Sequence, residues 1–358
     1  MSQPPSAEDQ LAFLFRVQRI LTEGAFVSTY KFALLLALAE LAIERADDTT
    51  TALDLDTQDI AEKFVEFYWR QVLPWVTPGG SAQRLYQATG GEAAILGCIA
   101  RAHDSAGGSL PRLRSARAEW KRLLADVGRT IAVMPLWKLQ TVGRVKEEFL
   151  YPNTGRGRVI RMRADALYCF RQFYTLIGDL VQTAWVRFIQ RLPRNQPLLG
   201  QARDLRGFLF GADRVALVRF ARVLRKHQEG RCFYCGRALT ALPAVDHFIA
   251  WSRYPLDLGH NFVLADGACN GNKADRLPAI EHLVRWAKRN SDGALIEEFE
   301  REALPHDLSA TTRVASWAYA QAERSRAQLW VAGRDGLEFL PANWRARTGW
   351  RAESIPQR

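Results

Sequence analysis

The chain has 358 residues, of which 48% are hydrophobic and 11% aromatic, a composition that excludes a disordered protein and allows more than one folded core. Its net charge of +11 is uneven: residues 1–110 carry 8 Lys and Arg against 14 Asp and Glu, residues 111–230 carry 24 against 9, and the rest 17 against 15. The polar N-terminus and the short apolar run at 32–39 predict neither a signal peptide nor a membrane span, so we expect a cytoplasmic protein without a membrane partner.

Residues 1–205 are predicted to form a mainly helical N-terminal region that serves recognition or regulation. Apolar residues at helical spacing indicate helices over 11–21 and 31–46. Asp56 is expected to cap a third helix, and the helix, short strand and helix around it fit either a helix-turn-helix arrangement or an ordinary bundle. The basic residues from about 111 onward indicate contact with phosphates, with a solvated basic surface as the alternative.

Three shorter features lie in the same region. The stretch SAGGS at 105–109 is expected to be a linker. The stretch FLYPNTGRGRVIRM at 149–162 is expected to be a small hairpin with NTGRG as its turn. Cys98 and Cys169 stand alone in apolar helical contexts, and we interpret both as buried small hydrophobic residues.

A metal site is predicted from two short-range pairs of residues further along the chain. Cys232 and Cys235 form C-x-x-C in a turn that ends at Gly236, and Asp266 and Cys269 form D-x-x-C. Two such pairs are the usual way to assemble four tetrahedral ligands around a structural zinc ion. Asp266 is the weakest member of the set, because a carboxylate is less common there than a thiolate and because helix capping also explains it.

A second group of polar residues lies between the two ligand pairs and after them in the chain. Asp246 and His247 interrupt a run that otherwise has the pattern of a buried strand. Asn261 follows at the start of a second strand-like run, and Asn270 and Lys273 come at the start of the next helix. The segment therefore predicts strand, loop, strand and helix, in that order.

This ordered set, which spans residues 227–278, resembles the HNH endonuclease family of ββα-metal nucleases. The resemblance implies hydrolysis of phosphodiester bonds, with His247 as the general base and with a catalytic Mg²⁺ or Mn²⁺ ion on Asp246 and Asn270. It also implies that Asn261 braces the loop between the strands and so orients His247.

Other residues of the segment have weaker interpretations. Lys273 and Arg253 are candidates for contact with nucleic acid, although Lys273 would otherwise help to close its helix. His260 matches no catalytic position of the family, so we interpret it as loop structure or as a peripheral phosphate contact. Trp251 is interpreted as a packing residue.

The predicted fold class is α+β: a mostly α-helical chain with a small zinc-stabilised ββα-metal (HNH) module at 206–290 between helical N- and C-terminal regions. Pro278 is expected to open one helix, and a longer helix is expected over 308–330. Residues 291–358 would hold the C-terminal helices and a tail rich in Trp and Arg, which either stacks on bases or folds back onto the protein.

The expected function is that of a metal-dependent DNA endonuclease in bacterial defence or restriction, with nucleic acid and an activating protein as partners. An RNA-cleaving HNH nuclease is one alternative, and a non-catalytic zinc-stabilised nucleic-acid-binding module is another. One ββα site cuts one strand, so a homodimer would be one way to cut both.

Overall fold

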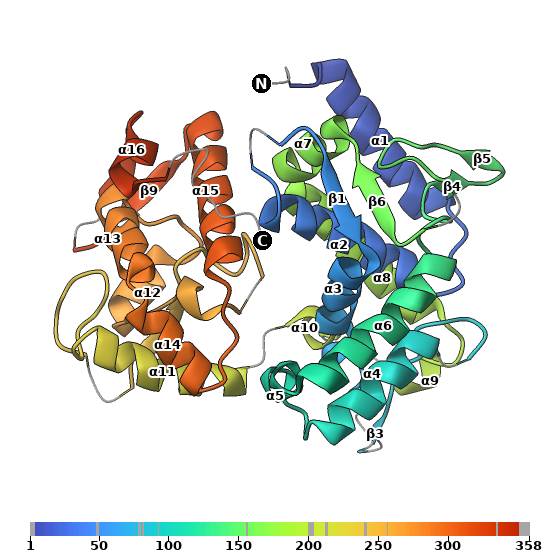
Figure 1. Ribbon diagram of the computed structural model, residues 1–358, viewed down its shortest axis with the longest axis horizontal. Coiled ribbons are helices and arrows are strands. Elements are labelled where there is room, and N and C mark those ends of the chain that lie inside the picture. Colours follow the sequence, from blue (N-terminus) through green and yellow to red (C-terminus); the bar gives the residue numbers. More distant parts are fainter. Residues whose placement is uncertain are drawn as a thin grey trace. The chain divides into compact units, whose positions relative to one another are not determined.

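The computed structural model describes residues 4–47, 50–77, 80, 82–91, 93–154, 157–199, 204–211, 214–239, 242–255, 257–333 and 336–350. The chain divides into two compact units, the first made of Met1–Ala42 and Asp48–Gly211 and the second of Ile43–Asp47 and Ala212–Arg358. Helices dominate and the strands form small two-stranded sheets (Figure 1), which confirms the predicted mixed, mostly helical class. In the described part of the chain, no helix combines the length and the apolar character needed to cross a bilayer.

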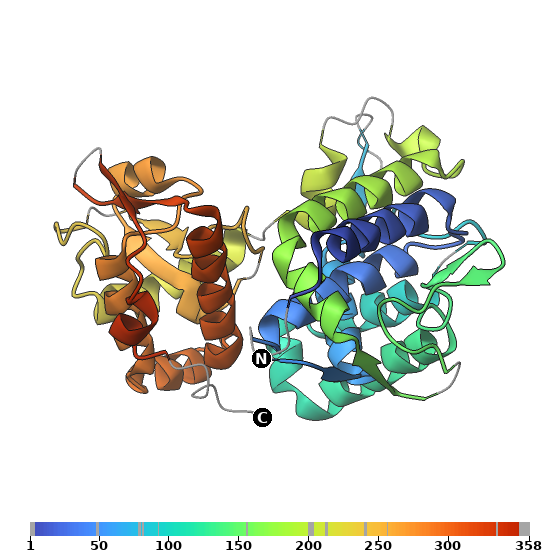
Figure 2. The ribbon, with the colours of Figure 1, turned by 90° about the horizontal axis from the view of Figure 1, so that it is seen from above.

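The first unit is built mainly from packed helices. They are α1 (Ala7–Glu23), α2 (Tyr30–Glu44, whose last two residues belong to the second unit), α3 (Thr57–Trp69), α4 (Ala94–Ser105), α5 (Leu110–Ser115), α6 (Arg117–Val133), α7 (Ala164–Gln172), α8 (Tyr174–Arg191), α9 (Gln196–Leu199) and α10 (Leu205–Phe210). Helix α6 packs against α3, α4 and α5, whereas α8 packs against α1, α7 and α10 (Figure 2). The helices expected over 11–21 and 31–46 are confirmed as α1 and α2. The stretch 105–109, expected to be a linker, joins α4 to α5 within the same unit.

Polar side chains cap the first turns of several of these helices, among them α1 and α3. At the start of α1, the hydroxyl of Ser6 accepts a hydrogen bond from the backbone N–H of Asp9. At the start of α3, Asp56 accepts from the N–H of Gln58, and the side chain of Asp59 accepts from the N–H of Asp56. This reciprocal pair is a capping box, so the predicted cap at Asp56 is confirmed.

The strands of the first unit correct one prediction. Strand β1 (Leu53–Asp56) pairs antiparallel with β6 (Val159–Met162), and 149–154 form no strand, so the two-stranded hairpin expected over 149–162 is not formed by the described residues. Residues 155 and 156 of its expected turn lie outside the described part. In this register Leu55 lies opposite Ile160, and both side chains are buried, which explains why the long-range pairing is favoured. Shorter pairs join β2 (Trp75–Val76) to β3 (Ala82–Gln83) and β4 (Thr141–Val142) to β5 (Val145–Lys146).

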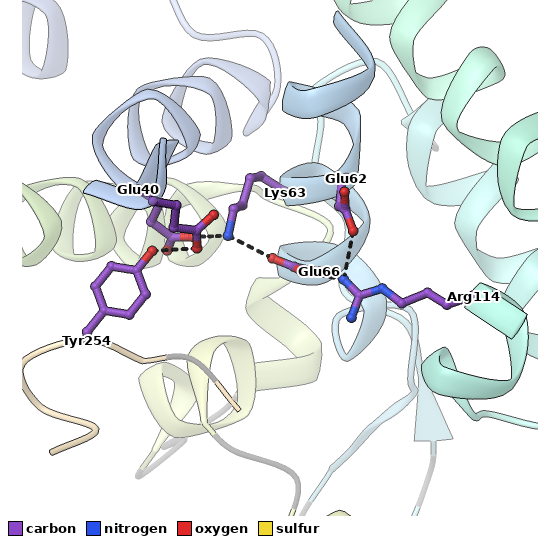
Figure 3. A network of polar contacts seen from close by, with 7 residues as sticks. Glu40, Glu62, Lys63, Glu66, Arg114 and Tyr254 are labelled. Carbon is purple, nitrogen blue, oxygen red and sulfur yellow. Dashed lines mark hydrogen bonds and ion pairs between the residues drawn. The ribbon is translucent and has the colours of Figure 1, made fainter. Parts of the chain in front are cut away.

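A buried cluster of charges joins helices of the first unit (Figure 3). Lys63 of α3 is only 4% exposed, and its ammonium lies 3.2 Å from the carboxylates of Glu40 and Glu66. Arg114 of α5 forms ion pairs with Glu66 and Glu62. Burial alone would raise the pKa of Glu66, but the charges of Lys63 and Arg114 lower it, so the carboxylate stays ionised.

Replacing Lys63 by Met is expected to destabilise the first unit by about 3–5 kcal/mol, because the buried Glu40 would lose the Lys63 ammonium, whereas Glu66 would keep its ion pair with Arg114. Urea unfolding followed by Trp fluorescence measures the change. The matched control is Arg161→Ala, which removes an exposed ion pair with Asp54 and is expected to have a much smaller effect. Equal effects of the two variants would contradict a stabilising role for the buried charges.

The second unit surrounds a β-hairpin. Strand β7 (Ala244–His247) pairs antiparallel with β8 (Phe262–Ala265), and α12 (Gly267–Lys273) follows β8 directly, which confirms the predicted order of strand, loop, strand and helix. The remaining elements are α11 (Arg214–His227), the 3₁₀ turn η1 (Gly259–Asn261), α13 (Ile280–Ser291), α14 (Ala294–Arg301), α15 (Leu308–Ser325), β9 (Gln328–Val331), β10 (Gly336–Phe339) and α16 (Trp344–Thr348). The described residues from 291 onward lie in the same unit as the hairpin.

Two helices of this unit begin or end at other residues than predicted. The helix expected to open at Pro278 begins at Ile280, because Pro278 forms a β-bridge with Trp330. The helix expected to reach Trp330 ends at Ser325, since Arg326 has a left-handed backbone with φ of 50° and the chain then enters β9.

The described part of the C-terminal tail folds back onto the second unit. Trp344 is fully buried. The ring of Trp350 lies 6.2 Å from that of Trp286 and 6.3 Å from that of Trp344. These contacts favour the packing alternative for the tail, of which residues 351–358 lie outside the described part.

The core of the second unit forms around β8. Phe262 and Leu264 pack with Phe220 of α11 and Phe299 of α14, and the rings of Phe220 and Phe262 are 4.6 Å apart. Gly259, at the start of η1, lies so close to Phe299 that an added Cβ would come within 2.6 Å of the ring. Only glycine permits this approach, which fixes the chain that leads into β8.

Candidate functional site

Four side chains with metal-binding atoms converge beside the hairpin. The Sγ atoms of Cys232, Cys235 and Cys269 and a carboxylate oxygen of Asp266 all lie within 4.8 Å of one another. The C-x-x-C turn closes where the N–H of Gly236 donates to the carbonyl of Cys232, and Gly236 has a φ of +73° that glycine adopts without strain. The predicted ligand set is therefore brought together, and it can hold a metal ion such as zinc.

Asp266 uses its two oxygens differently. Oδ1 accepts a 2.8 Å hydrogen bond from the N–H of Cys269 and so caps α12, whereas Oδ2 lies 3.0 Å from Sγ of Cys235. The hydrogen bond from the Cys235 thiol is the main cause that lowers the pKa of Asp266, and burial raises the pKa of both Cys235 and Cys269. Capping and metal binding are therefore compatible at this residue.

The cysteine turn is attached to β8 by the backbone of Leu264. The N–H of Phe233 donates to the carbonyl of Leu264 over 2.9 Å. The side-chain amide of Gln228 donates to the same carbonyl and accepts from the N–H of Leu264. A metal bound by the cysteines would therefore hold the turn, β8 and α12 together.

Asp246 is nearly buried and has protein partners on both oxygens. It is 8% exposed; Oδ2 accepts a 2.5 Å hydrogen bond from the Tyr234 hydroxyl, and Nζ of Lys273 lies 3.1 Å from each oxygen. Lys273 is completely buried and also donates to the carbonyl of His247. Burial lowers the pKa of Lys273, and the Asp246 carboxylate opposes that shift. Lys273 thus ties α12 to β7, and its ammonium cannot reach a phosphate at the surface.

His247 lies on the other side of the strand, because successive side chains of a strand point to opposite faces. Its Nε2 is 2.8 Å from Oδ1 of Asp257, and its ring centroid is 5.3 Å from that of Trp251 and 4.7 Å from that of Phe262. Among the described residues, Nδ1 has no hydrogen-bond partner and is not among the enclosed atoms. The imidazole therefore has one nitrogen held by a carboxylate and one without a hydrogen-bond partner among the described residues.

The two asparagines of the predicted site differ in their surroundings. Asn261 is buried; its Oδ1 accepts from the N–H of Ile249 over 2.8 Å, and its Nδ2 donates to the carbonyl of Ile249 over 3.1 Å. These bonds fix the loop that follows His247. Asn270 lies three residues before Lys273 and so on the same face of α12, and its side chain makes no hydrogen bond to the described residues. Its amide oxygen is available to a cation.

Arg253 and His260 are both engaged in the protein. Nε of Arg253 donates to the carbonyl of Asp275, which joins the loop after β7 to the end of α12. His260 is 0% exposed, with neither ring nitrogen hydrogen-bonded, and its ring packs against that of Phe299 at 5.3 Å. A phosphate contact by His260 is excluded, and of its two predicted interpretations loop structure holds.

Burial lowers the pKa of His260 to about 3, and nearby Arg289 adds to the effect. Between pH 6.5 and 3 the unfolded chain binds a proton at this residue and the folded chain does not, so stability present above pH 6.5 is lost as the pH falls. His260→Leu is expected to reduce the loss of unfolding free energy between pH 7 and pH 5 by about 2 kcal/mol. Urea unfolding of both proteins at the two pH values checks this; identical pH dependence would refute it.

Two partners of the site were not predicted from the sequence. Tyr234 lies inside the C-x-x-C turn, where its spacing from the cysteines indicates no contact with Asp246. Asp257 lies in the loop between the strands, and no motif marks it. A search for an acid that could hold the second nitrogen of His247 would have found Asp257 as one candidate among several acidic residues.

The comparisons with known proteins concern the first unit. The chain belongs to the family described as Domain of unknown function (DUF8808), whose model matches residues 10–205. The hairpin and the cysteine cluster lie outside the matched residues. No curated protein and no solved structure matches the chain.

Proposed function

We propose that the second unit is a metal-dependent HNH-type endonuclease that hydrolyses phosphodiester bonds in DNA. The observation that carries the proposal is the state of His247, which ends strand β7: one ring nitrogen is held by a carboxylate, and the other has no hydrogen-bond partner among the described residues. The helix after the hairpin carries Asn270, whose side chain makes no hydrogen bond to the described residues. A histidine held in this way is suited to take a proton from a water molecule, which phosphodiester hydrolysis requires.

The protein's own groups account for the handling of that proton. With Nε2–H donated to Asp257, the lone pair of the imidazole lies on Nδ1, which accepts the proton of the attacking water. The carboxylate of Asp257 then stabilises the imidazolium that forms. The buried side chain of Asn261 holds the backbone of Ile249, two residues after His247, so the ring keeps its place during the transfer.

A divalent cation would be held by Asp246 and Asn270. Their oxygens suit Mg²⁺ or Mn²⁺, and a carboxylate has about four acceptor positions, of which Tyr234 and Lys273 use part. When bound, the ion would stabilise negative charge on the phosphate and on the leaving oxygen. The ammonium of Lys273 would repel that ion, so binding at Asp246 is expected to be weaker than at a free carboxylate.

The first unit would recognise the target or an activating protein. Exposed basic side chains on α6 (Arg117, Lys121 and Arg122) support contact with phosphates. They do not distinguish DNA from RNA, so an RNA-cleaving nuclease is a variant of the same proposal. A role in bacterial defence or restriction rests on the resemblance to HNH nucleases alone.

A second candidate is a zinc-stabilised nucleic-acid-binding module without catalysis. It is favoured by one observation: Asp246 is already neutralised by the buried Lys273 and needs no metal ion for its charge balance. This candidate gives no role to Nδ1 of His247, which has no hydrogen-bond partner among the described residues.

The deciding experiment compares the full chain with His247→Ala on supercoiled plasmid, linear duplex, single strands and RNA, with Mg²⁺, Mn²⁺ or EDTA. Because His247 would activate the water, the variant is expected to bind nucleic acid normally but to lose metal-dependent cutting. His103→Ala, in the first unit, is the matched control and should cut normally. Retention of cutting by His247→Ala would overturn the assignment of the base, and binding without cutting by the unmodified protein would support the second candidate.

A further inference from the structure

We propose that Asp257 is the positioning residue of the reacting histidine: it holds His247 in the Nε2–H tautomer and turns Nδ1 toward the water. The inference rests on the proposed function and assigns to Asp257 the tautomer and the orientation of the reacting ring. Asp257 Oδ1 lies 2.8 Å from Nε2, within hydrogen-bond distance, and the side chains are 13% (His247) and 24% (Asp257) exposed. The contact therefore lies at the surface, where a substrate could reach it, but is partly shielded from solvent.

Strand geometry explains why Asp257, and not the neighbouring Asp246, serves this histidine. Residues next to each other on β7 point to opposite faces, so the Asp246 carboxylate lies with Tyr234 and Lys273. Two charged groups contact His247 itself. The ammonium of Lys273 donates to its backbone carbonyl, and the carboxylate of Asp257 bonds its ring. Asp257 is therefore the carboxylate on the ring's own side of the strand.

The loop that carries Asp257 is fixed on both sides. Before it, Tyr254 is buried and donates a 2.6 Å hydrogen bond to Glu44, which belongs to the same unit. After it, the N–H of Gly259 donates to the carbonyl of Pro305 over 2.9 Å. The His247 ring is itself confined by contact with aromatic side chains, so both members of the pair have restricted positions.

The first test is spectroscopic and does not depend on activity. In the full chain labelled with ¹⁵N-histidine, the Nε2 of His247 is expected to carry a proton that exchanges slowly with solvent, assigned by its loss in His247→Gln. Asp257→Ala should abolish this protected proton, whereas Asp275→Ala, which alters a nearby exposed acid, should leave it. A proton on Nδ1 instead, or a protected signal unchanged by Asp257→Ala, would overturn the pairing.

The second test is kinetic. Asp257→Ala is expected to lower kcat by about 10-fold to 100-fold with little change in KM, because Asp257 acts on the proton acceptor and not on substrate binding. Asp257→Asn keeps the volume of the side chain and should also lower kcat, since an amide cannot stabilise the imidazolium; it serves if the alanine variant fails to fold. Unchanged kcat in both variants would overturn the positioning role.

The two tests separate two kinds of failure. If the unmodified protein shows the protected proton but cuts no nucleic acid, the proposed function and the positioning role both fail while the His247–Asp257 contact stands. If it cuts nucleic acid but shows no protected proton, the proposed function stands and the role of Asp257 fails.

Discussion

Removal of metal from the cysteine cluster is expected to unfold the β7–β8–α12 segment. Cys232, Cys235, Asp266 and Cys269 join the turn, β8 and α12 at one point, whereas the hairpin itself has only four residues in each strand. Apparent binding free energies of structural zinc are about 10–16 kcal/mol in small modules, far more than such a hairpin gains from its own pairing. We therefore expect the metal-free segment to lose its structure at neutral pH.

Metal analysis of the purified chain, circular dichroism and limited proteolysis with and without a zinc chelator measure this effect. Cys235→Ser should reproduce the chelated state, because it removes one ligand. The control is Cys98→Ser in α4, which lies outside the cluster and should not change the metal content. A chain purified without bound metal, with a Cys235→Ser variant of unchanged thermal stability, would contradict a structural metal site.

Replacing Lys273 by Met is expected to make the stability of the second unit depend on divalent cations. Loss of the ammonium leaves the nearly buried Asp246 carboxylate with the Tyr234 hydroxyl as its one partner among the described side chains, which is expected to cost about 3–5 kcal/mol. A divalent ion bound by Asp246 and Asn270 would replace the missing positive charge. Mn²⁺ should therefore raise the melting temperature of Lys273→Met by more than it raises that of the unmodified protein.

Thermal unfolding with and without Mn²⁺ measures the difference. Lys288→Met, at an exposed position of α13, is the matched control and should respond to Mn²⁺ as the unmodified protein does. The double variant Lys273→Met, Asn270→Ala should lose the added response. An absence of any Mn²⁺ response in Lys273→Met would show that Asp246 does not bind a divalent ion in this chain, and the non-catalytic alternative would then be preferred.

Several features of the fold could be predicted because they depend on neighbouring residues. Asp56 caps α3 through groups two and three residues away, and the apolar spacing of α1 is visible within a few turns. The pairing of β1 with β6 could not be predicted, because the stretch around NTGRG has the local pattern of a turn while the partner strand lies far away in the sequence. Local patterns show which residues can form a strand but not which strand pairs with it.

The sequence by itself determined the metal-binding cluster and the order of strand, loop, strand and helix. The two members of each ligand pair are spaced for one turn and must lie close together in any compatible fold, and their donor types predict that the two pairs meet at one ion. Only the tertiary structure decided the partners of the two central residues. Asp246 and His247 are adjacent in the chain, yet the alternation of the strand sends one to Lys273 and the other to Asp257. The physical reason is that the partner of a side chain depends on the face it occupies and on the loops packed there, and both are set by long-range packing.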